Sequence, residues 1–303
     1  MAGLCEGRVV IVTGAGRGLG RAHALAFAAE GAKVVVNDLG AERDGQGSST
    51  GPAGEVVDQI RAAGGEAIAD GADVADWDQA EALVAAAVDA FGRLDVLVNN
   101  AGFLRDRMLA NMSEDEWDAV VRVHLKGHMA PSRHAMAHWK ARAKAGEDVQ
   151  GRLINTSSGA GLLGSVGQGN YSAAKAGIVG LTLVESAELG RYGVTANAIA
   201  PAARTRMTEE VFAATMAAPA EGDFDEMAPE NVSPLGVWLG SVESAGVTGR
   251  VFEVEGGKVG VADGFQHGPT EDKGARWDPS ELGPVVASLL EAAPAPAPVY
   301  GAG

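Results

Sequence analysis

The sequence contains a single cysteine, Cys5, among its 303 residues. One cysteine cannot form an intrachain disulfide, and a zinc site built from several cysteines is excluded. Aromatic residues are scarce at 5%, and no apolar run approaches the length of a membrane span. The segment before Arg8 is too short and too polar for a secretory signal. These features predict a cytoplasmic protein that does not enter a membrane.

Positive charge is also in short supply. The chain has 24 Lys and Arg against 40 Asp and Glu, which gives a net charge of −16. Such a surface repels phosphate backbones and anionic lipid surfaces, so neither nucleic acid nor a membrane is an expected partner. Hydrophobic residues, in contrast, make up 46% of the chain, enough for one large domain with a buried core.

Short β-branched runs alternate with alanine-rich segments along most of the chain. This alternation predicts an α/β fold with a parallel sheet covered by helices on both faces. The expected strands are 8–13, 33–38, 66–70, 94–99, 152–157, 194–200 and 250–254, and the expected helices are 19–30, 53–63, 77–91, 114–143 and 171–192. We divide the chain into one domain, 1–265, and a C-terminal extension, 266–303. The extension ends in a Pro/Ala-rich stretch that we expect to be extended or disordered.

A glycine-rich turn, TGAGRGLG, separates the first expected strand from the first expected helix. Gly14, Gly18 and Gly20 allow a tight turn and a close approach to a pyrophosphate, and Arg17 and Leu19 lie between them. The amino end of the following helix offers free N–H groups to the same anion. A plain tight turn is the alternative, but the strand before and the helix after favour a dinucleotide site. No Gly-Lys-Ser/Thr follows, which disfavours a nucleotide triphosphatase.

Asp38 ends the second expected strand, about 20 residues beyond the glycines, where a carboxylate accepts hydrogen bonds from an adenosine ribose. That carboxylate would repel the extra phosphate of NADP, whereas Arg17 could pair with it. We judge the carboxylate the stronger influence and predict NAD, with NADP less favoured. The alternative is that Asp38 is only a turn residue at a strand end.

Tyr171 and Lys175 are one helical turn apart, so they share a face of the expected helix. Ser158 follows a strand, at an edge where ligands bind in open α/β sheets. We expect the lysine cation to lower the pKa of the tyrosine from about 10 toward 7, which requires about 4 kcal/mol. Ser158 would hold a substrate oxygen while Tyr171 moves its proton. A tyrosine and a lysine at this spacing are usually a surface contact, but the preceding glycine turn favours catalysis.

Four sequence features occur in the order and spacing of a known protein family: TGAGRGLG at 13–20, NNAG at 99–102, Ser158 and YSAAK at 171–175. Together they resemble the short-chain dehydrogenase/reductase family over roughly residues 7–260. The resemblance implies a single Rossmann-type, doubly wound parallel sheet of about seven strands. It also implies cofactor contacts from Asp73, Val74, Asn100, Ala101, Gly102, Tyr171, Lys175 and Pro201. Considered alone, NNAG is a polar strand-end turn and Asp73 an acidic loop residue.

Longer stretches resemble the (3R)-hydroxyacyl-CoA dehydrogenase group of peroxisomal multifunctional enzyme type 2. They are VVVNDLG at 34–40, AGFLRDRML at 101–109, RVHLKG at 122–127, QGNYSAAKAG at 168–177, NAIAP at 197–201, RM at 206–207 and PENVSPLGVWL at 229–239. The likeness implies NAD(H)-dependent interconversion of a 3-hydroxyacyl-CoA and a 3-ketoacyl-CoA by a homodimer or homotetramer. A steroid or other bulky alcohol dehydrogenase and a non-catalytic NAD-binding redox sensor are the alternatives. The stretch after Val261 departs from the pattern and leaves the acyl group open.

Four of the six histidines fall in one expected helix, at 124, 128, 134 and 138. We interpret them as part of a mixed helix surface, within a subunit contact, and expect no metal site. His124 stands where many members of the resembling family have an asparagine in a proton relay. It either orients a relay water or is a buried, hydrogen-bonded histidine.

Overall fold

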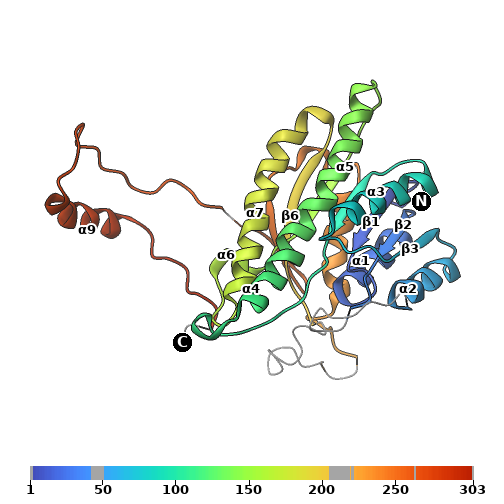
Figure 1. The fold of residues 1–303 in the computed structure, drawn as a ribbon, viewed down its shortest axis with the longest axis horizontal. Helices are drawn as coiled ribbons and strands as arrows, with labels where there is room; N and C mark the ends of the chain where they lie inside the picture. The colour runs from blue at the N-terminus through green and yellow to red at the C-terminus, as the bar shows by residue number, and fades with distance from the viewer. Residues whose placement is uncertain (1–2, 42–50, 205–218, 220–221, 263, 302–303) are drawn as a thin grey trace.

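The computed structural model describes residues 3–41, 51–204, 219, 222–262 and 264–301. Within these ranges one sheet runs through the molecule in the order β3-β2-β1-β4-β5-β6-β7-β8 (Figure 1). The strands are β1 Val9–Thr13, β2 Lys33–Asn37, β3 Ala67–Asp70, β4 Val96–Asn99, β5 Arg152–Thr156, β6 Thr195–Ala202, β7 Val251–Glu255 and β8 Lys258–Ala262. The first seven pair in parallel, as the sequence predicts, and the α/β class is confirmed.

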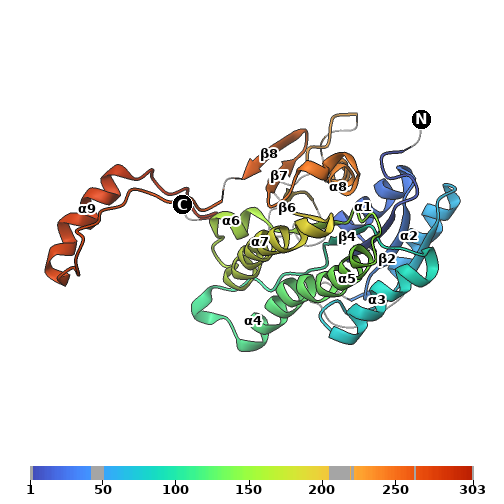
Figure 2. The ribbon, with the colours of Figure 1, turned by 90° about the horizontal axis from the view of Figure 1, so that it is seen from above.

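Helices cover both faces of the sheet. They are α1 Gly18–Ala29, α2 Gly51–Ala62, α3 Trp77–Phe91, α4 Glu114–Val121, α5 Gly127–Lys144, α6 Gly159–Leu163, α7 Gly169–Leu189, α8 Ser233–Gly240 and α9 Leu282–Ala292. Helices α1, α2 and α8 pack on one face, and α3, α5 and α7 on the other (Figure 2). None of the helices within the described ranges is both long enough and apolar enough to span a bilayer.

The central strands are buried on both sides, which explains their continuous β-branched character. In β1, Val10 and Val12 point into the core under α1 and α8. Val9 and Ile11 alternate with them and point into the core under α3 and α5. Burial of both faces fixes the register of the strand, and therefore fixes which residues emerge at its carboxyl end.

The prediction of one continuous helix at 114–143 is wrong in one respect. Helix α4 begins at a capping box formed by Ser113 and Glu116, and a π-helical segment, Arg122–Lys126, separates it from α5. The interruption lies where His124 turns inward and contacts the backbone of Phe103. Residues 122–126 include neither glycine nor proline, so the sequence gives no clear break and only this tertiary contact marks it.

The seven expected strands are joined by an eighth. Strand β8 pairs antiparallel with β7 through a tight turn at Gly256 and Gly257. The sequence analysis missed it because β8 is a short edge strand, mostly exposed, with Gly260 in its middle. It therefore lacks the buried β-branched run that reveals the other strands.

The C-terminal extension contains a helix that the sequence analysis did not foresee. Helix α9 stands away from the sheet in both views (Figures 1 and 2), and none of its residues is buried. The proline-alternating stretch after α9 has no helix or strand, and the chain then returns to the body, where Tyr300 bridges to Ser165. The division at residue 265 stays a prediction.

Candidate active site

The site begins where the strand order changes direction. From β1 the chain builds outward through β2 and β3, and then crosses to β4 on the other side of β1. At such a switch point the loops after two neighbouring strands diverge and leave a crevice at their carboxyl ends. The glycine turn follows β1, and NNAG spans the end of β4, so both border this crevice.

The glycines of the turn are needed for close backbone approaches. Gly14 has a φ of 63°, and a Cβ there would lie 2.7 Å from the Cα of Ala101. A Cβ on Gly20 would lie 2.1 Å from the carbonyl oxygen of Gly14. Arg17, the N-cap residue of α1, makes no side-chain cap. The amino end of α1 is therefore suited to a phosphate-bearing ligand.

Thr13 ties the glycine turn to NNAG. Its Oγ1 accepts the backbone N–H groups of Asn100 at 2.9 Å and Ala101 at 3.1 Å. The Asn100 Nδ2 donates back to the carbonyl oxygens of Thr13 and Gly14, at 2.9 and 3.2 Å. The sequence analysis did not single out Thr13, although it opens the glycine motif. These hydrogen bonds join the glycine turn to NNAG.

Asp38 lies beside the glycine turn, as its spacing predicts. Its carboxylate accepts the N–H of Gly16 at 2.8 Å and that of Gly40 at 2.7 Å. Arg17 is exposed, whereas Leu19 packs against the core under α1. The Asp38 carboxylate is therefore fixed next to the turn, while Arg17 is exposed at the surface.

The remaining expected cofactor residues lie at the same edge. Asp73, in the connection after β3, pairs with Arg122 at 2.6 Å. Val74 is buried, and Pro201 lies near the carboxyl end of β6, paired with Val254. Arg206 and Met207 lie outside the described residues.

The structure brings Ser158, Tyr171 and Lys175 together. Ser158 caps α6, with its Oγ accepting the N–H of Ala160 at 3.2 Å, and its side chain also hydrogen-bonds Tyr171. Lys175 is buried, and its Nζ lies 5.5 Å from the centre of the Tyr171 ring. That Nζ donates to the carbonyl oxygen of Thr156 at 2.6 Å. Two helix starts and one strand end thus meet at a single point.

The pKa of Tyr171 runs opposite to the sequence expectation. Burial raises it, the hydrogen bond with Ser158 lowers it, and the Asp106 carboxylate raises it. Burial also lowers the pKa of Lys175 to about 7, so its positive charge is weakly held at neutral pH. Lys175 is not among the groups that shift the pKa of Tyr171, so the expected lowering is not seen in the protein alone.

His124 adjoins this cluster and is buried. Its Nε2 lies 2.7 Å from the carbonyl oxygen of Phe103, and its ring meets the Tyr171 ring edge-on at 5.1 Å. A Cβ on Gly102 would lie 2.1 Å from the His124 ring, which explains the glycine of NNAG. Burial and the Lys175 charge lower the pKa of His124 to about 3. The histidine is thus neutral, and its buried Nδ1 has no partner among the described atoms.

The interpretation of the four histidines as a helix surface is wrong for three of them. His124, His128 and His134 are at most 5% exposed, because the helix that carries them lies against the sheet. Within the described residues, no group of three or more His, Cys, Asp or Glu side chains is placed to hold a metal ion.

Asp106 is a residue that sequence reasoning missed. It accepts a hydrogen bond from Gln168 at 2.9 Å, and burial raises its pKa. Because it acts electrostatically on Tyr171, it belongs to the site. Asp106 belongs to AGFLRDRML, a stretch that contributed to the family resemblance but gave no indication of a role for this residue.

A buried polar network supports the site from behind. Asn99 donates to Asn155 at 2.9 Å, and Asn155 donates to Glu185 at 2.8 Å. Ser132 accepts from Asn99 at 2.9 Å and also hydrogen-bonds Glu185. Burial raises the pKa of Glu185 to about 7. The network joins β4, β5, α5 and α7, and sequence periodicity gave no sign of it.

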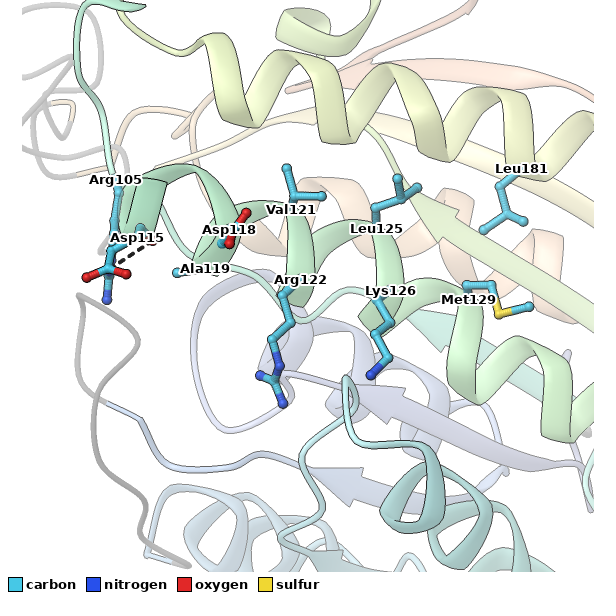
Figure 3. Close-up of a pocket in the computed structure, with 10 residues that line it drawn as sticks. All are labelled: Arg105, Asp115, Asp118, Ala119, Val121, Arg122, Leu125, Lys126, Met129 and Leu181. Carbon is cyan, nitrogen blue, oxygen red and sulfur yellow. Dashed lines mark hydrogen bonds between the residues drawn. The ribbon is translucent and has the colours of Figure 1, made fainter. Parts of the chain in front are cut away.

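A separate hollow of about 810 Å³ lies along α4, the π-helical segment and α5 (Figure 3). Leu125 and Met129 line it together with Leu181 from α7, and Arg105, Arg122 and Lys126 add positive charge. None of the residues predicted for catalysis or cofactor binding lines this hollow.

A family model described as short chain dehydrogenase matches residues 8–215. The chain belongs to the short-chain dehydrogenase family. A crystal structure of a short chain dehydrogenase from Mycobacterium avium is 68% identical, with a TM-score of 0.90, covering 99% of this chain and 100% of that one. The family implies an oxidoreductase with a nicotinamide dinucleotide, and the start of α1, which has no side-chain cap, and the closely packed glycines of the turn fit such a group.

Two curated relatives carry more specific names. The hydroxyacyl-CoA dehydrogenase ChsB1 of Mycobacterium tuberculosis is 49% identical over 284 residues, which cover 91% of this chain and 86% of that protein. The peroxisomal multifunctional enzyme type 2 of Mus musculus is 46% identical over 258 residues. That match covers 84% of this chain but only 32% of the mouse protein, so the chain corresponds to about a third of it.

Proposed function

We propose that this protein is an NAD(H)-dependent dehydrogenase that interconverts a 3-hydroxyacyl-CoA and a 3-ketoacyl-CoA. The observation that carries the proposal is the meeting of Tyr171, Ser158 and Lys175 at the carboxyl ends of the parallel strands, the same edge of the sheet as the glycine turn. The names of the mycobacterial and mouse relatives support the choice of a hydroxyacyl-CoA as substrate.

In this proposal Ser158 and Tyr171 handle the substrate oxygen. In the protein alone the Ser158 side chain hydrogen-bonds Tyr171, and in this proposal its hydroxyl donates to the substrate oxygen when substrate binds. Tyr171 takes the hydroxyl proton during oxidation and returns it during reduction. The bound dinucleotide supplies the hydride acceptor. Gly14, Gly18 and Gly20, with the amino end of α1, would hold its diphosphate.

The preference for NAD rests on Asp38. Its carboxylate is fixed beside the glycine turn by the N–H groups of Gly16 and Gly40, so it cannot easily move away from a nearby phosphate. An additional phosphate there would meet the negative charge of this carboxylate at close range. Asp73, Val74, Asn100, Ala101, Gly102 and Pro201 complete the proposed cofactor contacts, with Arg17, Leu19, Tyr171 and Lys175.

The Tyr171→Phe variant tests the proposal. Removal of the acid/base hydroxyl should lower kcat on a 3-hydroxyacyl-CoA by about 10²–10⁴-fold, measured as NADH absorbance. NADH binding, measured by fluorescence, should persist. Tyr192→Phe is the matched control, since Tyr192 lies at the far end of α7 and should leave kcat unchanged.

Other results would contradict the assignment. Full activity in Tyr171→Phe would refute the role given to Tyr171. Wild-type protein that binds NADH but turns over neither 3-hydroxyacyl-CoA nor steroid alcohols would favour a redox sensor. A higher kcat/KM on a steroid alcohol would favour the bulky-alcohol alternative.

A homodimer or homotetramer and a cytoplasmic location stay part of the proposal. Leu183 and Val184 are exposed on the outer face of α7, next to Leu181 of the hollow. Such an apolar helix face supports a subunit contact.

A further inference from the structure

The C-terminal end of the described chain is tied to the segment after α6. The N–H of Val166 donates to the carbonyl oxygen of Tyr300 at 2.9 Å, and the N–H of Tyr300 donates to Gly164 at 3.2 Å. We call residues Val299–Gly301 the C-terminal strap. Because α6 begins directly after Ser158, these bonds hold the strap near the proposed catalytic cluster.

The ring of Tyr300 lies over Gly159, the residue that follows Ser158. A Cβ on Gly159 would lie 3.0 Å from the Tyr300 Oη and 3.1 Å from its Cε2. Since glycine has no side chain, nothing from position 159 stands between the ring and the backbone beside Ser158. The ring is nevertheless 47% exposed, so part of it can contact a ligand.

A second segment lies against the start of α7, the helix that carries Tyr171. Arg107 forms an isolated bridge with Gln168, just before α7. The Leu109 side chain lies over Gly169, where a Cβ would be 2.2 Å from its Cδ2. Leu109 therefore contacts α7 at a position two residues before Tyr171, yet it is 64% exposed.

Apolar side chains remain exposed on all three segments. They are Met108, Leu109, Val166, Val299 and Tyr300, which we call the strap surface. Backbone bonds tie 107 to 167 and 300 to 164 and 166, so these segments are held in place next to the site. Clustered exposed apolar groups beside a catalytic crevice are the usual form of a ligand-binding surface.

We propose that the strap surface binds the acyl chain of the substrate beyond its reacting end, with Tyr300 as a specificity-determining contact for the longer chains. The inference rests on the proposed function and adds what the catalytic cluster alone does not provide, a place for the apolar part of a long acyl thioester. It predicts a preference for long over short acyl chains that depends on the C-terminal extension.

The first test compares a long-chain and a short-chain 3-hydroxyacyl-CoA. Tyr300→Ala should lower kcat/KM for the long chain by about tenfold, through KM, which corresponds to about 1.4 kcal/mol of lost apolar contact. The short-chain substrate should change by less than about twofold. Tyr300→Phe keeps the ring and should retain the preference. Tyr192→Phe is again the control.

The second test uses the single cysteine. Cys5 is fully buried, and burial raises its pKa to about 11, so it should react slowly. In Tyr300→Cys a thiol reagent should label the strap, and long-chain 3-ketoacyl-CoA with NAD should slow the labelling. Val242→Cys is the control, because Val242 lies near the amino end of β5, at the opposite edge of the sheet.

The outcomes separate the two proposals. Wild-type protein that turns over neither substrate refutes the proposed function and the strap inference with it. Turnover with an unchanged long-to-short ratio in Tyr300→Ala, or labelling of Tyr300→Cys that acyl-CoA does not slow, overturns the strap inference alone. A change in oligomeric state at an unchanged ratio would assign the strap surface to a subunit contact and also overturn it.

Discussion

Replacing Glu185 by glutamine should make the protein more stable above neutral pH. Glu185 is 2% exposed, and burial raises the pKa of its carboxyl to about 7 from an ordinary value of 4.5. Hydrogen bonds from Asn155 and Ser132 lower this pKa, but they do not offset the desolvation. The folded protein therefore prefers the neutral carboxyl, which glutamine imitates at every pH.

The size and sign follow from this pKa. At about 1.36 kcal/mol for each pKa unit, the difference between 4.5 and 7 corresponds to roughly 3 kcal/mol. The stability that the neutral carboxyl contributes is fully present below pH 4.5 and is lost as the pH rises through about 7. Above that pH, Glu185→Gln should exceed the wild type by up to about 3 kcal/mol, and below 4.5 the two should converge.

Urea denaturation followed by tryptophan fluorescence, at one protein concentration and a series of pH values, would measure the difference. Glu188→Gln is the matched control, because Glu188 is exposed on the same helix and its replacement should change stability by less than about 0.5 kcal/mol. If the stability curves of wild type and Glu185→Gln run parallel across pH, the account of a buried, neutralised carboxyl is refuted.

Two further predictions concern the site. Asp106→Asn removes a carboxylate that raises the pKa of Tyr171, so the rising limb of the pH–rate profile for alcohol oxidation should move to lower pH; an unmoved limb would contradict the coupling. Asp38→Asn removes the fixed charge beside the glycine turn, and the ratio of kcat/KM for NAD over NADP should fall about tenfold or more. An unchanged ratio of kcat/KM for NAD over NADP would contradict this role of Asp38 and show that another residue determines the cofactor preference.

The sequence predicts the fold well because its strands and helices alternate with distinct periodicities. Buried strands such as β1 carry continuous β-branched residues, and Gly14, Gly18 and Gly20 mark the turn after it. Edge strand β8 and helix α9 escaped prediction because neither is buried against the body of the domain, and burial is what imposes a pattern on the residues. Helices α6 and α8 escaped it as well, because at 5 and 8 residues they are too short to show a clear helical period.

The candidate site divides in the same way. The order of TGAGRGLG, NNAG, Ser158 and YSAAK along the chain was enough to name the proposed catalytic groups, because each lies next to a strand end or on one helix turn. Asp106 and Tyr300 come from loops whose positions depend on the fold, so no local spacing relates them to Tyr171 or Ser158.

By itself, the sequence determined the α/β class, a parallel sheet of about seven strands and the family, because these depend on local patterns and motif spacing. Only the tertiary structure decided the electrostatics. Burial, which no local pattern measures, raises the pKa values of Tyr171 and Glu185 and lowers those of Lys175 and His124. It is a property of the whole packed fold, since the atoms that exclude water from each group come from distant parts of the chain.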